Sequence, residues 1–209
     1  MRRQPDHKAK VVFMGSSGVG KTSIILRHNG REFSTEVTPT LGANFVHSTI
    51  MTQTSKRVEL EIWDTAGSEK FACMMPMYLR RSRGAFLVFD VADRQTFTDI
   101  LKWYGELERA CNVAELSLVL VGNKIDLEHR RIVDEMEGRT FAEERNMMYI
   151  ETSALQDRRI GEMMHTMANQ LISRYESRHL SSQSKVEDTV VMTPPTTERE
   201  NKCNCTNNV

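Results

Sequence analysis

The most informative segment of this chain is Gly15-Ser16-Ser17-Gly18-Val19-Gly20-Lys21-Thr22, which has the form G-x-x-x-x-G-K-[ST]. It follows the apolar run KVVFM, residues 10–14, and opens the helical pattern KTSIILRHN, residues 21–29. Glycines let backbone N–H groups turn inward around phosphate oxygens, and the following helix presents its positive end to the same charge. A strand before the pattern and a helix after it are the context that it requires. The segment therefore predicts a phosphate-binding loop, in preference to a glycine-rich turn that binds nothing.

Two side chains at the end of this loop have predicted roles. The Lys21 ammonium supplies positive charge for β- and γ-phosphates, and the Thr22 hydroxyl is a ligand for Mg²⁺, which takes oxygen ligands and keeps several waters. The nucleotide-binding residues predicted here are Gly15, Ser16, Ser17, Gly18, Val19, Gly20, Lys21, Thr22 and Ser23.

Short β-branched or aromatic runs alternate with segments of helical period along the chain. Strands such as AFLVFDV (85–91) and LSLVLVG (116–122) are almost continuously apolar, which is typical of parallel strands covered on both faces. The segments NFVHSTIMTQ (44–53) and KRVELEIWD (56–64) lie so close together that they predict an antiparallel hairpin. We therefore predict an α/β fold with a six-stranded, mostly parallel sheet that has one antiparallel strand and about five flanking helices.

Composition limits the classes of function. Lys plus Arg and Asp plus Glu both number 28, so a net charge of zero gives no electrostatic case for nucleic acid. The four cysteines follow no zinc-ligand spacing, and the N-terminal residues lack the apolar core of a signal peptide, so we expect a cytoplasmic protein. No apolar run approaches the roughly 20 residues that span a bilayer. From about Ser177 the chain is rich in Ser, Thr, Pro and Asn, which predicts a domain over residues 8–176 and a disordered tail over 177–209.

Asp64 ends the strand pattern VELEIW and is the acid expected to hold Mg²⁺ opposite Thr22. A turn or helix cap is the ordinary role of such an aspartate, and only the phosphate loop upstream favours a metal ligand. The turn Asp64-Thr65-Ala66-Gly67 follows. The Gly67 N–H is placed to meet a γ-phosphate oxygen, and so to sense whether that phosphate is present.

The predicted base-reading segment is Asn123-Lys124-Ile125-Asp126, directly after a buried-looking strand. The Asp126 carboxylate can accept hydrogen bonds from both N1–H and the exocyclic amine of guanine, whereas adenine has no donor at N1. Guanine is therefore favoured. A second loop, Glu151-Thr152-Ser153-Ala154, can donate a backbone N–H to the guanine carbonyl, although a simple serine or threonine turn explains it equally well.

With these motifs in order, residues 8–176 resemble the Ras superfamily and, within it, the Rab family. The resemblance implies a P-loop small-GTPase fold that binds GTP or GDP with Mg²⁺. Phe33 lies seven residues before Thr40, as in the family's first switch, where the aromatic ring packs beside the base and the threonine binds Mg²⁺ and γ-phosphate. The segments Glu69-Lys70-Phe71 and Pro76-Met77-Tyr78 are similar to those of early-endosomal Rab members.

Phe45, Trp63 and Tyr78 occupy the places of the aromatic triad that Rab proteins present to effectors. Without the resemblance, each would be read as a core or hairpin-face aromatic. The resemblance also implies an exchange factor, a GTPase-activating protein and a monomeric protein.

The chain departs from the family pattern at two positions. Ser68 stands where the second switch usually carries the glutamine that orients the attacking water. Serine is too short to reach that position, and because a 1 Å misplacement can cost about 10²-fold, we predict slow intrinsic hydrolysis. Leu155 follows Ser153-Ala154 where the family has a lysine whose stem lies along the base. Guanine selectivity should survive this change because it depends on Asp126.

Cys203 and Cys205 form a C-N-C pair that resembles the doubly geranylgeranylated ends of Rab proteins. Four residues follow the second cysteine, so the end is not a C-a-a-X box. Unmodified cysteines and reversible palmitoylation are the alternatives. Lipidation at this pair would make the protein peripheral on intracellular membranes, endosomal ones if the early-endosomal similarity holds.

The leading functional prediction is a GTP/GDP switch of vesicle trafficking that hydrolyses GTP, with Lys21 and Gly67 in the catalytic group and Ser68 in place of the water-positioning residue. The alternative is a non-cycling, GTP-bound module that recruits effectors without useful catalysis. A P-loop kinase is disfavoured by Asn123-Lys124-Ile125-Asp126 and by the lack of an identified lid segment.

Overall fold

The structure is a computed structural model that describes residues 4–35, 40, 43–67 and 74–187, with the side chains of 179–187 excepted. The strands are β1 (His7–Met14), β2 (Ala43–Met51), β3 (Arg57–Thr65), β4 (Gly84–Asp90), β5 (Ser117–Asn123) and β6 (Met148–Glu151). The α-helices are α1 (Lys21–His28), α2 (Met75–Leu79), α3 (Arg94–Thr98), α4 (Ile100–Ala110), α5 (Glu135–Glu143) and α6 (Ile160–Glu187). Two 3₁₀ helices are η2 (Val113–Glu115) and η3 (Ile125–Arg130).

The strands form one sheet in the order β2-β3-β1-β4-β5-β6. Every neighbouring pair is parallel except β2 and β3, which pair antiparallel, with Phe45 opposite Trp63. The predicted six-stranded, mostly parallel sheet is confirmed. Parallel strands present their carboxyl ends at one edge of a sheet, so the segments that follow β1, β3, β5 and β6 gather there.

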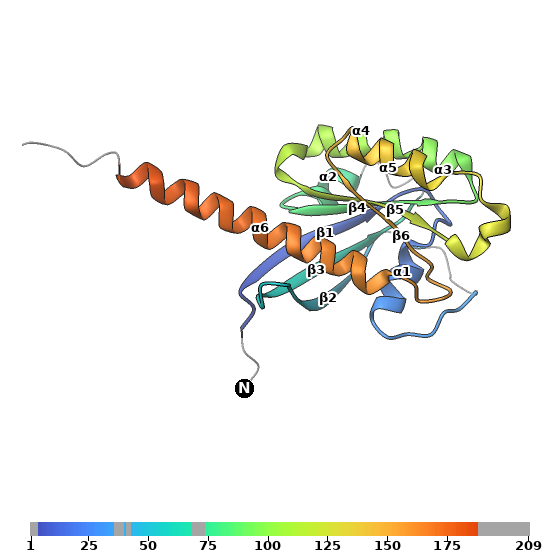
Figure 1. Cartoon of the computed structure of the whole chain (residues 1–209), viewed down its shortest axis with the longest axis horizontal. Helices are drawn as coiled ribbons and strands as arrows, with labels where there is room; N and C mark the ends of the chain where they lie inside the picture. The colour runs from blue at the N-terminus through green and yellow to red at the C-terminus, as the bar shows by residue number, and fades with distance from the viewer. Residues whose placement is uncertain (1–3, 36–39, 41–42, 68–73, 188–209) are drawn as a thin grey trace, which may run out of the picture. The chain divides into compact units, whose positions relative to one another are not determined.

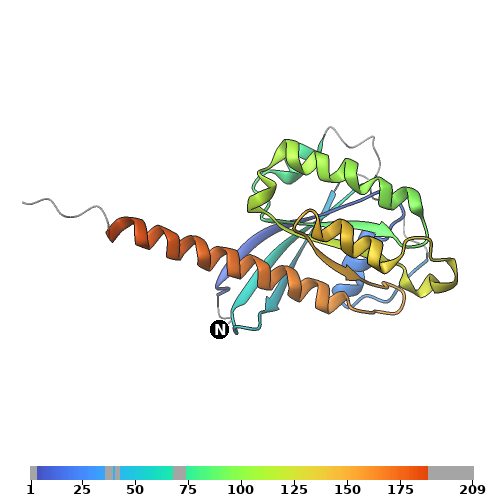
Figure 2. The same cartoon turned by 45° about the horizontal axis from the view of Figure 1, so that its top comes forward.

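Helices cover both faces of the sheet, and each face has its own apolar core (Figure 1). α1 and residues 160–175 of α6 lie on one face, where Ile24 and Met163 pack against alternate side chains of β1, β3, β4 and β5. The helices α2, α3, α4 and α5 lie on the other, and Figure 2 shows α4 and α5 side by side over that face. All seven residues of β4 and of β5 are buried, as their apolar runs predict.

The described residues contain one more α-helix than the expected count of about five. Two of these helices, α3 and α4, follow one another directly and are divided at Asp99. The backbone continues through the division, because the Asp99 N–H donates to the Gln95 carbonyl and the Trp103 N–H donates to the Asp99 carbonyl. The break is therefore local.

The chain divides into two units that meet between residues 175 and 176. The described part of the second unit is helical backbone as far as Glu187, so the first residues of the segment expected to be disordered are helical. Residues 188–209, with Cys203 and Cys205, lie outside the described residues, and the domain limits 8–176 and 177–209 stay predictions. Within the described part of the chain, no helix is both long and apolar enough to span a membrane.

Candidate nucleotide and metal site

The loop between β1 and α1 has a backbone that requires glycine at two points. Gly15 has φ +144°, and a Cβ built there would lie 2.1 Å from the Val88 carbonyl oxygen. Gly20 has φ +96°, and its Cβ would lie 2.4 Å from Nδ2 of Asn123. Side chains would therefore be strained by conformation and blocked by neighbours. The loop is fixed against both β4 and the base-reading segment.

Lys21 is the first residue of α1, directly after this loop, and its side chain is buried. Its Nζ donates to the carbonyl oxygens of Gly15 at 2.7 Å and Ser16 at 2.9 Å. Burial lowers the pKa of Lys21 to about 8, and the nearby Asp64 carboxylate opposes that shift. The buried Lys21 ammonium, beside the backbone of the glycine-rich loop, is suited to bind phosphate oxygens. Such oxygens would replace the water contacts that the ammonium loses on burial.

The three predicted metal ligands converge. The Thr22 hydroxyl donates to Oδ2 of Asp64 at 2.7 Å and lies 3.0 Å from the hydroxyl of Thr40. These residues come from α1, the end of β3 and the segment before β2, so only the fold brings them together.

The donor set fits Mg²⁺. Among the described residues, the buried Oδ1 atom of Asp64 has no hydrogen-bond partner, so this carboxylate oxygen is open to a metal ion. Burial raises the pKa of Asp64, whereas the Thr22 hydroxyl and the Lys21 charge lower it. One carboxylate and two hydroxyls suit a hard cation that takes its other ligands from phosphates and water. Within the described residues, no group of three or more His, Cys, Asp or Glu side chains is arranged to hold a metal ion elsewhere.

Gly67 lies against the phosphate loop at the end of the turn after β3. A Cβ on this residue would come within 2.5 Å of the Ser16 carbonyl and of the Ser17 nitrogen. The backbone of the second switch therefore touches the backbone of the loop, and the role of Gly67 in sensing a terminal phosphate stays a prediction. Ser68, the next residue, lies outside the described residues, so its predicted effect on hydrolysis stays a prediction.

The base-reading segment is tied to both neighbouring loops. The Asn123 amide is buried and donates to the Val19 carbonyl at 2.8 Å, while the Thr152 hydroxyl donates to Oδ1 of Asn123 at 3.2 Å. Asp126 Oδ1 accepts from the Ser153 hydroxyl at 2.5 Å. Asn123 therefore links the phosphate loop to the second base-side loop, and Ser153 of that second loop holds Asp126.

The Lys124 side chain extends from the end of β5 to the end of β4. Its backbone has φ +67°, and its Nζ lies 2.7 Å from Oδ2 of Asp90 at the end of β4. The ammonium is one third exposed and the aspartate mostly buried, so this ion pair fixes the direction of the side chain.

Comparison with known proteins identifies the family. The Ras family profile matches residues 10–173. The Ras-related protein Rab-17 of Mus musculus is 39% identical over 166 residues, which are 79% of this chain and 77% of that protein. Rab-18-B of Danio rerio is 44% identical over 145 residues (69% and 70%), and Rab-21 of Geodia cydonium is 38% identical over 171 residues (82% and 74%). The chain belongs to the Rab family. It is a small GTPase of vesicle trafficking within the Ras superfamily.

The remaining predicted nucleotide residues of this Rab-family protein differ in exposure. Phe33 is partly buried against the core on the α1 side. Ala154 is buried, while Leu155 is 49% exposed, so the leucine is open to a ligand or to solvent. Ser23 is half-buried within α1, and Ser17 and Gly18 are exposed at the loop surface.

The three aromatic residues predicted to contact effectors form one row in this Rab-family protein. The Phe45 and Trp63 ring centroids are 5.5 Å apart, those of Trp63 and Tyr78 are 6.1 Å apart, and the Lys10 ammonium lies 4.3 Å from the centre of the Trp63 ring. Phe45 is 47% exposed, whereas Tyr78 is buried. A partner that docks here would meet Phe45 directly, and the role of the row stays a prediction.

Sequence reasoning missed Asp90 and Asp99. Asp90 ends an apolar strand, a position that could have marked it as a partner of the neighbouring loops. Asp99 lies 83 residues from Ser16, to which it is hydrogen-bonded, and no spacing or motif predicts that contact.

Proposed function

We propose that this Rab-family protein is a Mg²⁺-dependent switch between GTP-bound and GDP-bound states. The observation that carries the proposal is the convergence of Thr22, Thr40 and Asp64 around an unpartnered carboxylate oxygen, next to the buried Lys21. Thr40 belongs to the first switch, so a metal ion and a γ-phosphate would hold that segment in place. Mg²⁺ supplies charge that neutralises the phosphates when it is bound.

Selection of guanine rests on Asp126. The Ser153 hydroxyl fixes one of its carboxylate oxygens, and Asn123 anchors the segment to the phosphate loop. A carboxylate held in this way favours a base with adjacent N–H donors, which guanine has and adenine lacks. Leu155 supplies apolar surface in place of the lysine stem.

Hydrolysis of GTP to GDP and phosphate should be slow in this chain. Lys21 and the Gly67 N–H are the groups that would stabilise charge on the γ-phosphate, but Ser68 lacks the amide that orients the attacking water. Single-turnover hydrolysis should therefore be at least about 10-fold faster in Ser68→Gln than in wild type, at equal GTP affinity. Equal rates in the two proteins would show that Ser68 does not limit turnover.

A second candidate function is a persistently GTP-bound interaction module, and Ser68 is the observation that favours it. Nucleotide extracted from protein purified from cells separates the two candidates. Mostly GDP supports the cycling switch, with its exchange factor and activating protein, and mostly GTP supports the module. An activating protein that supplies an arginine in trans would recover much of the rate.

Attachment to intracellular membranes is proposed through Cys203 and Cys205. The tail lacks a polybasic stretch, since Lys185, Arg199 and Lys202 are offset by nearby acidic residues, so two lipids would be needed for stable anchoring. The double variant Cys203→Ser/Cys205→Ser should move from the membrane fraction to the supernatant of fractionated cells. Unchanged membrane association in that variant would exclude the cysteines as anchors. Similarity to early-endosomal members favours endosomal membranes as the compartment to test first.

A further inference from the structure

Ser16 makes side-chain contacts that the nucleotide site does not require. Its hydroxyl donates to Oδ2 of Asp99 at 2.9 Å and accepts a longer contact from Nε1 of Trp103 at 3.4 Å. Asp99 stands at the break between α3 and α4, and Trp103 is buried one turn further along α4. The second residue of the phosphate loop is thus fastened to the helical layer that covers the opposite side from α1.

The backbone of Ser16 is occupied at the same time by the phosphate machinery. Its carbonyl oxygen accepts from the Lys21 ammonium at 2.9 Å, and Gly67 packs so closely on it that a Cβ would come within 2.5 Å. One residue therefore touches the charged group for the phosphates, the proposed γ-phosphate sensor and the α3–α4 break. Any change in the backbone of Ser16 must alter all three contacts.

We infer that Ser16 is a positioning residue that couples the α3–α4 junction to the presence of a terminal phosphate. The inference rests on the proposed GTP/GDP switch. The Asp99 and Trp103 contacts hold the Ser16 carbonyl where Gly67 can pack on it and reach a γ-phosphate. GDP has no γ-phosphate, so the coupling acts on GTP and leaves GDP largely unaffected.

The two tryptophans of the chain, Trp63 and Trp103, give a direct readout. In full-length protein labelled with 5-fluorotryptophan, the ¹⁹F resonance of Trp103, assigned with Trp103→Phe, should differ between the GDP complex and the complex with a hydrolysis-resistant GTP analogue. Ser16→Ala should abolish that difference. It should also lower the affinity for the analogue relative to GDP by about 5- to 20-fold, the effect expected for part of a hydrogen bond to a charged group.

Thr98→Ala is the matched control, because it removes an exposed hydroxyl that bonds only within α3, to the Arg94 carbonyl. It should keep both the resonance shift and the affinity ratio. Asp99→Ala should reproduce Ser16→Ala. The double variant Ser16→Ala/Asp99→Ala should lose no more than either single variant, since each single variant already removes the hydrogen bond between Ser16 and Asp99. Additive losses would overturn the coupling, and so would an unchanged ratio in Ser16→Ala.

The test separates this inference from the function on which it rests. Wild-type protein that binds neither GDP nor the GTP analogue would refute the switch itself. Wild-type protein that binds both, together with a Ser16→Ala variant that keeps the wild-type ratio and resonance shift, would refute the coupling alone. If Ser16→Ala does not fold, Asp99→Ala provides the same two readouts outside the loop.

Discussion

At the scale of single residues, Thr22 joins the two halves of the metal site, because its hydroxyl contacts both Asp64 and Thr40. Thr22→Val keeps the shape of the side chain and removes that hydroxyl. We expect GDP to dissociate about 10- to 100-fold faster in the presence of Mg²⁺, the loss expected for one strong polar contact. Release of a fluorescent GDP analogue measures this rate.

The same substitution at an exposed site of β2, Thr49→Val, is the control and should leave release unchanged. Chelating Mg²⁺ should accelerate release strongly in wild type and weakly in Thr22→Val. Equal sensitivity of the two proteins to chelation would remove Thr22 from the metal site.

Because the pKa of Lys21 is lowered by burial, we predict that the stability of the nucleotide-free protein depends on pH. The folded pKa of about 8 lies below the ordinary 10.5, so burial of the charged ammonium destabilises the fold in full below pH 8. The unfolded chain binds more protons between pH 8 and 10.5, and stability therefore rises with pH across that window. Relative to Lys21→Met, the free energy of unfolding should rise by roughly 1 to 3 kcal/mol between pH 7.5 and 10. Urea unfolding at several pH values measures it, and parallel pH profiles would contradict the assignment.

Residue identities at the site were largely predictable, whereas their connections were not. The pattern from Gly15 to Thr22 has the spacing and flanking elements of a phosphate-binding loop, and that role stays a prediction. The contact of Ser16 with Asp99 depends on how α4 packs over the sheet, which no local pattern specifies. The sequence alone allowed two roles for Asp64, a metal ligand or a turn cap. The contact between its carboxylate and the Thr22 hydroxyl favours the metal ligand.

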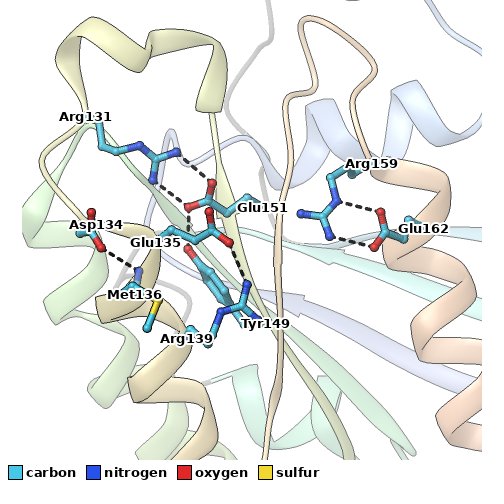
Figure 3. Close-up of polar contacts among 9 residues, drawn as sticks. All are labelled: Arg131, Asp134, Glu135, Met136, Arg139, Tyr149, Glu151, Arg159 and Glu162. Atoms are coloured by element: carbon cyan, nitrogen blue, oxygen red, sulfur yellow. Dashed lines mark hydrogen bonds and ion pairs between the residues drawn. The ribbon is translucent and has the colours of Figure 1, made fainter.

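At the scale of elements, the end of β6 is held by a polar cluster (Figure 3). Both carboxylate oxygens of Glu151 accept from Arg131, at 2.7 and 2.9 Å, and the Tyr149 hydroxyl donates to the same carboxylate at 2.8 Å. Glu151 is buried, and burial together with its charge raises the pKa of Tyr149. Arg131→Ala would leave a buried carboxylate without its cation, so we expect a loss of about 2 to 4 kcal/mol in the free energy of unfolding.

Arg159→Ala is the matched control for Arg131, because Arg159 forms an exposed pair with Glu162 one helical turn away (Figure 3). It should cost no more than about 0.5 kcal/mol. Because Glu151 precedes the loop that holds Asn123 and Asp126, Arg131→Ala should also weaken GDP binding. Similar stability losses in the two arginine variants would show that the cluster is not structural.

Two helical glycines provide a second test at this scale. Gly105 in α4 has open space around a built Cβ, whereas a Cβ on Gly138 in α5 would lie 2.5 Å from the Tyr149 ring. Alanine favours a helix over glycine by about 1 kcal/mol. Gly105→Ala should therefore stabilise the fold by up to that amount, and Gly138→Ala should destabilise it. Thermal unfolding of both variants measures the two changes in stability. Changes of the same sign would contradict the difference in space around Gly105 and Gly138.

Strands with long apolar runs were predicted well. The points at which helices divide or end were predicted less well. The apolar runs of β4 and β5 specified buried parallel strands, and the close spacing of β2 and β3 specified the hairpin. The division between α3 and α4 at Asp99 was not predicted, and the Asp99 carboxylate accepts a hydrogen bond from Ser16 of the phosphate loop. The continuation of α6 to Glu187 was missed because its later residues are polar.

At the scale of the whole molecule, the sheet places four separate segments at one edge. The last residues of β1, β3, β5 and β6 and the loops that follow them supply the phosphate loop, Asp64 with Gly67, the base-reading segment and the loop that holds it. Membership of the Rab family explains why these segments occur together in one chain. We therefore expect this edge of the sheet to bind guanine nucleotides with Mg²⁺.

Competition for a bound fluorescent GDP analogue tests that claim most directly. In excess Mg²⁺, GTP and GDP should displace the analogue at concentrations roughly 10³-fold or more below those needed for ATP, because adenine leaves the Asp126 carboxylate without a donor at N1. Displacement by ATP at the same concentrations as GTP, or displacement that does not depend on Mg²⁺, would contradict the account.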